Sequence, residues 1–71
     1  MDKNNNDVKI TTYDKLLRAW QNSMELVRDF EVYSKEVKDN DEARDAFAEF
    51  AEDECLHAAR FRELILKYQR Q

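Results

Sequence analysis

The chain has 71 residues, a formal net charge of −4, and neither glycine nor proline. Phosphate-binding loops of the GxGxxG or GxxxxGK[ST] kind need glycine because the backbone must approach the phosphate closely, so dinucleotide-binding and P-loop proteins are excluded. The 12 basic residues form no block that would neutralise a nucleic acid, and no apolar run approaches the roughly 20 residues of a membrane span. We therefore expect no nucleic-acid or membrane partner. A single cysteine and no signal-peptide pattern favour a cytoplasmic location.

The chain begins with a polar segment that is expected to be a flexible leader, residues 1–11. A helix is predicted to start beside it, because Thr11 and Asp14 have the spacing of a capping box and place a carboxylate near the positive helix end. Nothing interrupts the sequence from there to Lys38. The first predicted helix therefore spans about residues 12–38.

The only break in the remaining sequence is the segment of residues 39–42, Asp-Asn-Asp-Glu. Asn tolerates the left-handed conformation and Asp caps a following helix, so a turn without glycine is feasible there. A second helix of about residues 41–68 follows. Two nearly equal helices with a short connection predict an all-α fold, an antiparallel two-helix hairpin over residues 12–71.

Each predicted helix has one apolar face when residues are placed at about 100° per step. Glu54 and His57 fall within that face of the second helix, one turn apart, and Glu31 falls on the apolar stripe of the first helix. The expected core positions of the first helix are Leu16, Leu17, Trp20, Met24, Leu26, Val27, Phe30, Tyr33 and Val37. Those of the second are Ala43, Ala46, Phe47, Phe50, Ala51, Ala58, Phe61, Leu64, Ile65 and Tyr68.

Glu54 and His57 form a Glu-x-x-His pair, and residues three apart share a helix face, so both side chains reach one metal ion. A hairpin of this length has a marginal core and no possible internal disulfide, so a partner chain, a metal or both are expected to stabilise it. A two-fold dimer would give a four-helix bundle with two copies of Glu31, Glu54 and His57, which is the ligand set of a di-iron or di-manganese carboxylate bundle. The alternative is that Glu54 and His57 hydrogen-bond or ion-pair inside the hairpin interface.

The stretch FAEFAEDECLHAARF, residues 47–61, resembles the second metal-binding helix of the ferritin-like superfamily, rubrerythrin branch. The pattern F-x-x-x-A-x-x-E-x-x-H-A carries the resemblance. The two-helix length is also similar to encapsulated-ferritin-type proteins, which complete their bundle by dimerisation. The resemblance implies a homodimer or higher homo-oligomer in which Glu54 and His57 bind iron, with manganese or zinc possible. It also implies ferroxidase activity or reduction of oxygen or peroxide, with no catalytic residues beyond the metal ligands.

The sequence departs from this family at Met24, which stands where the family has its ligand glutamate in the first helix. Glu31 is the favoured substitute ligand because it lies on the apolar stripe. Glu25 is the alternative, since its position along the hairpin axis matches that of Glu54 better, although its side chain points away from the apolar face. The same departure supports a second hypothesis, a non-catalytic helical dimerisation module with a vestigial or structural polar site.

Overall fold

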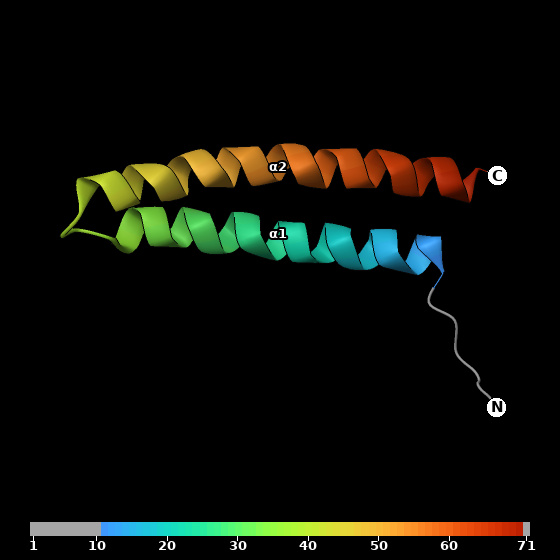
Figure 1. The fold of residues 1–71 in the computed structure, drawn as a ribbon, viewed down its shortest axis with the longest axis horizontal. Coiled ribbons are helices and arrows are strands. Elements are labelled where there is room, and N and C mark those ends of the chain that lie inside the picture. The colour runs from blue at the N-terminus through green and yellow to red at the C-terminus, as the bar shows by residue number, and fades with distance from the viewer. Residues whose placement is uncertain (1–10, 71) are drawn as a thin grey trace, which may run out of the picture.

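The computed structural model describes residues 11–70, which fold as two antiparallel helices lying side by side (Figure 1). Helix α1 is Thr12–Glu36 and helix α2 is Asp41–Gln69. The all-helical, two-helix fold predicted from the sequence is confirmed. The expected leader, apart from Thr11, lies outside the described residues, and association into a four-helix bundle stays a prediction.

A capping box fixes the start of α1. The Asp14 backbone N–H donates to Thr11 Oγ1 at 3.1 Å, and the Thr11 N–H donates to Asp14 Oδ2 at 3.3 Å. These bonds satisfy backbone donors that have no partner within the helix, and the Asp14 carboxylate lies at the positive end of the helix dipole.

Replacing Thr11 by alanine is expected to lower the free energy of unfolding by about 1 kcal/mol, because it removes the oxygen that accepts from Asp14 N–H. Urea unfolding followed by circular dichroism measures the change. Thr12→Ala is the matched control, since Thr12 is exposed and lies inside the helix. Equal losses in the two variants would contradict the assigned cap.

The connection between the helices is four residues long, and its first and last residues, Val37 and Asn40, are both extended. Helix α1 ends at Glu36, two residues before the predicted Lys38, because Val37 is extended with φ −73° and ψ 118°. Asn40, rather than an aspartate, caps α2: its Oδ1 accepts from the Ala43 N–H at 2.9 Å. Its φ of −154° is extended, so the expected left-handed conformation is not used at Asn40.

The helices pack along a seam whose residues recur at alternating spacings of three and four, as in an antiparallel coiled coil. Small residues fill its middle, where Ser23, Ala51 and Ala58 are all buried. Because these side chains are short, the two helix backbones approach closely there. The seam residues are Leu16, Trp20, Ser23, Val27 and Phe30 on α1, and Phe47, Ala51, Glu54, Ala58, Phe61, Ile65 and Tyr68 on α2.

Aromatic contacts close both ends of the seam and fix its register. Near the connection, the rings of Phe30 and Phe47 are 5.9 Å apart. At the open end, the rings of Tyr13 and Tyr68 are 6.3 Å apart. These two pairs place Glu54 opposite residues 23–27 of α1.

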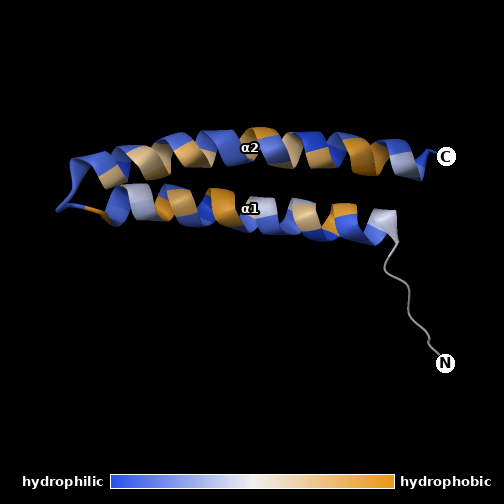
Figure 2. Ribbon diagram, in the orientation of Figure 1, coloured by the Kyte–Doolittle hydropathy of each residue, from blue (hydrophilic) through white to orange (hydrophobic). Residues whose placement is uncertain are grey.

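The seam buries less apolar surface than the sequence predicts. Apart from Ser23, only Val27, Ala51, Ala58 and Ile65 are buried among the described residues. The expectation that every residue on the apolar faces is core is wrong for Met24, Leu26, Tyr33, Phe50 and Tyr68, which are 39–49% exposed. Apolar residues recur along the whole length of both helices (Figure 2). Within residues 11–70, neither helix contains a stretch apolar enough to cross a membrane.

Candidate metal-binding pair

Glu54 and His57 lie together near the middle of α2. Glu54 Oε1 and His57 Nδ1 are 3.3 Å apart, one helical turn along the chain. The Glu54 side chain is only 16% exposed, whereas that of His57 is 64% exposed. The pair therefore has a carboxylate partly withdrawn from water and an imidazole open to solvent.

Glu54 occupies a seam position between Ala51 and Ala58, as its predicted place on the apolar face requires. A carboxylate held among apolar groups costs free energy unless a cation, a hydrogen-bond donor or a metal compensates it. The His57 Nδ1 lies within hydrogen-bonding distance of this carboxylate. The sequence-based placement of His57 in the middle of the apolar face is wrong, because His57 lies one position before the seam and its ring is mostly exposed.

Glu31 does not lie beside this pair within one chain. It is exposed, and the register places it opposite residues 46–50. That is about six residues from Glu54, or roughly 9 Å along the helix axis. Glu25 is at the height of Glu54 but is also exposed, on the side of α1 away from the seam. Among residues 11–70 no group of three or more His, Cys, Asp or Glu side chains is gathered for a metal ion.

The seam divides the rest of the hairpin surface into two faces with different chemistry. In an antiparallel pair, the residues directly before every second seam position on either helix flank the seam on one side, and those directly after the remaining seam positions flank it on the other. Leu17, Arg62 and Gln69, all directly after seam positions, line one shallow hollow, which confirms this assignment.

We name the first side the Leu26–Phe50 face; it comprises Ala19, Leu26, Tyr33, Ala43, Phe50, His57 and Leu64. We name the opposite side the Met24–Cys55 face; it comprises Leu17, Met24, Glu31, Ala48, Cys55 and Arg62. Cys55 is exposed there. His57 and Glu31 therefore lie on opposite faces of the hairpin, in addition to their separation along the axis.

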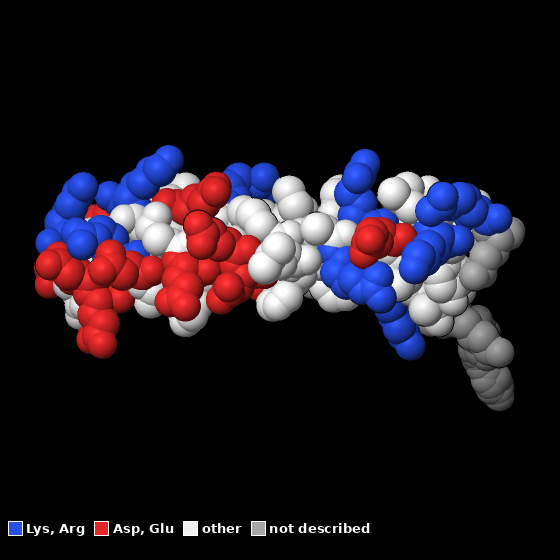
Figure 3. Space-filling view, turned by 90° about the horizontal axis from the view of Figure 1, so that it is seen from above, with Lys and Arg blue, Asp and Glu red and all other residues white. Residues whose placement is uncertain are grey.

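The charges are strongly separated along the hairpin, a feature that the sequence analysis missed. Residues 25–54, the half that includes the connection, hold twelve acidic and four basic residues. Residues 11–24 and 55–70, the other half, hold two acidic and six basic residues. Viewed over α2, acidic side chains gather toward the connection and basic ones toward the chain ends (Figure 3). Counting charges separately in each half of the predicted hairpin would have found this polarity.

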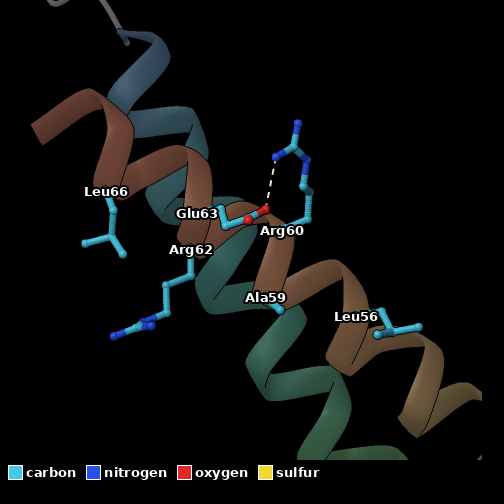
Figure 4. Close-up of a pocket in the computed structure, with 6 residues that line it drawn as sticks. All are labelled: Leu56, Ala59, Arg60, Arg62, Glu63 and Leu66. Carbon is cyan, nitrogen blue, oxygen red and sulfur yellow. Dashed lines mark hydrogen bonds and ion pairs between the residues drawn. The ribbon is translucent and has the colours of Figure 1, made fainter. Parts of the chain in front are cut away.

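A shallow hollow lies on the outer side of α2, away from the seam. Leu56, which is 70% exposed, and Leu66 lie at its two ends, with Ala59 between them (Figure 4). Arg60 and Glu63 form an ion pair of 3.0 Å beside it. The hollow is open and its polar groups do not converge, so it lacks the form of a small-molecule site.

Comparison with known proteins gives no match for this chain: no family model, no curated protein and no solved structure matches it. The resemblance to the ferritin-like superfamily therefore stays an expectation from the sequence, with no matching protein beside it.

Proposed function

We propose that the chain binds iron, or manganese or zinc in its place, through Glu54 and His57 when two hairpins associate. The observation that carries the proposal is a carboxylate at a seam position, 16% exposed, with the only histidine 3.3 Å away. Carboxylate oxygen and imidazole nitrogen together suit these three metals. The resemblance of residues 47–61 to a ferritin-like metal-binding helix supports the same ligands.

One hairpin supplies two ligands, so the remaining ones come from a second copy. Two Glu54 and two His57 would complete a four-ligand site for one ion. A di-metal site needs a further carboxylate from each chain, for which Glu31 and Glu25 are the candidates. Iron held with an open position would react with oxygen or peroxide, which is the basis of the proposed ferroxidase or oxidoreductase activity.

Anaerobic titration with Fe²⁺, followed by dialysis and metal analysis, tests the proposal. We expect one iron ion per chain if a carboxylate of α1 takes part, and one per two chains if only Glu54 and His57 do. The double variant Glu54→Ala/His57→Ala is expected to bind Fe²⁺ at least about tenfold more weakly. Glu52→Ala is the matched control, because Glu52 is exposed on the same helix. Unchanged binding by the double variant, or no binding by the native chain, overturns the proposal.

Oxygen consumption on adding Fe²⁺ separates an enzyme from a metal-binding protein. The native chain is expected to consume oxygen in proportion to the iron added, and the double variant to match the protein-free rate. Iron binding without oxygen or peroxide consumption would assign the metal a structural role.

The second candidate is a non-catalytic dimerisation module. It is favoured by one specific observation, that Glu31 lies on the opposite face from His57 and no third ligand joins the pair within the described residues. Glu54 and His57 would then be a structural polar pair or a vestigial site that dimerisation does not need. Self-association that persists in the double variant, with no metal bound to the native chain, is the result expected for this alternative.

A further inference from the structure

The Leu26–Phe50 face is apolar and lacks a covering element among the described residues. Three of its large side chains, Leu26, Tyr33 and Phe50, are 40–49% exposed. None of its seven positions carries Lys, Arg, Asp or Glu, and His57 is its only ionisable group besides the tyrosine hydroxyl. The Met24–Cys55 face, in contrast, carries Glu31 and Arg62. The Leu26–Phe50 face is therefore the side on which a further layer of helices would bury most apolar surface.

The aromatic side chains of this face are already anchored. The Tyr33 ring lies 5.3 Å from that of Phe47, and the Phe50 ring lies 6.5 Å from that of Phe30. Each exposed ring is thus held against a seam residue of the other helix. Association would cost little side-chain entropy at these positions, because the rings are ordered before contact.

The charge polarity indicates what covers this face. An acidic half and a basic half on one chain are complementary to a second copy that is turned end for end. Two hairpins can stack face to face about a two-fold axis in two ways. An axis parallel to the helices places both connections at one end, and so brings two acidic halves together. An axis perpendicular to the helices places the connections at opposite ends, and so brings each acidic half against a basic half.

We propose that the chain forms a two-fold dimer through the Leu26–Phe50 face with its two connections at opposite ends of the bundle. Helix α2 then lies antiparallel to α2 of the other copy. Asp53 of one copy comes near Arg60 of the other at the edge of the interface. Because residue 55 is the midpoint of α2, both Glu54–His57 pairs lie near the two-fold axis. The inference rests on the association of two chains in the proposed function, but it does not depend on metal.

The distance between the two connections tests the orientation. A nitroxide on Asp39→Cys, in a chain that also carries Cys55→Ser, reports that distance by double electron–electron resonance in metal-free buffer and again with Fe²⁺. Opposite-end connections are expected about 40 Å apart, the length of one helix. Same-end connections are separated only by the bundle width, roughly 10–20 Å. A distance below about 30 Å overturns the proposal, as does a chain that stays monomeric in both buffers.

Interface variants test the face. Phe50→Glu is expected to raise the dimer dissociation constant at least about 100-fold in analytical ultracentrifugation, because it places a charge in the apolar interface. Leu56→Glu is the matched control on the outer side of α2 and is expected to leave the constant within about threefold. Circular dichroism checks that both variants remain helical. Dissociation by Leu56→Glu with none by Phe50→Glu overturns the assignment. Loss of iron binding with the distance of about 40 Å intact would refute only the proposed metal site.

Discussion

Replacing Ala58 by leucine is expected to lower the free energy of unfolding by about 1–3 kcal/mol. Ala58 is 3% exposed and lies in the middle of the seam, where small side chains let the helices approach closely. Leucine has no space there unless the helices separate or the side chain adopts a strained rotamer. In a domain of this size each kcal/mol corresponds to about 4–8 °C in the unfolding midpoint, so thermal unfolding followed by circular dichroism resolves the change.

Ala59→Leu is the matched control for this prediction. It makes the same chemical change one residue further along α2, but Ala59 is exposed at the outer hollow between Leu56 and Leu66. Its free energy of unfolding is expected to stay within about 0.5 kcal/mol of that of the native chain. Both variants are measured at one protein concentration, because association makes the midpoint concentration-dependent. Equal losses at Ala58 and Ala59 would contradict the close approach of the helices at the seam.

The sequence was sufficient for the two helices because their ends are determined locally. Thr11 and Asp14 have the residue types and spacing of a capping box, and the structure forms it. The break was also predicted from residue types alone, since no other part of the described chain carries a cluster of turn-forming residues. The wrong detail was which residue caps α2: Asn40 does so in an extended conformation, and Asn is as favourable as Asp at an N-cap, so residue type alone did not separate the two.

The extent of the core was overpredicted because a wide apolar face is not the same as a two-helix seam. A helix in a larger protein buries an arc of about 100° or more, whereas a single partner helix covers only the narrower stripe with spacings of three and four. Met24 and Leu26 lie on either side of that stripe and stay partly exposed. Ser23 was missed for the opposite reason, since it is polar but lies on the stripe and is buried.

The candidate site was predictable only in the part that belongs to one helix. Glu54 and His57 lie three residues apart on α2, so helical geometry alone brings them together. Whether Glu31 joins them depends on the register between α1 and α2 and on which of the two faces of the hairpin each residue lies. The structure places Glu31 about two turns away, as the better match of Glu25 in height already indicated, and on the opposite face, which the sequence analysis did not foresee.

Replacing Glu54 by leucine is expected to stabilise the metal-free protein while abolishing its response to iron. A leucine at this seam position packs between Ala51 and Ala58, and it removes the cost of holding a carboxylate among apolar groups. We expect a gain of about 1 kcal/mol in the free energy of unfolding without metal, from the partial burial of one leucine side chain. Iron that binds only the folded native chain raises its free energy of unfolding by about 2.7 kcal/mol at a free iron concentration of 100 Kd. It is expected to leave the free energy of unfolding of the variant unchanged.

Glu52→Leu, at an exposed position of α2, is the control. It is expected to change the free energy of unfolding without metal by no more than about 0.5 kcal/mol and to leave the response to iron unchanged. Thermal unfolding of the three proteins with EDTA and with anaerobic Fe²⁺ gives both quantities. Destabilisation by Glu54→Leu without metal would mean that the carboxylate supports the fold, as the polar-pair alternative requires. Stabilisation without metal, together with loss of the iron response, would mean that the seam keeps a carboxylate at a cost to the fold. Binding iron is the function that would account for that cost.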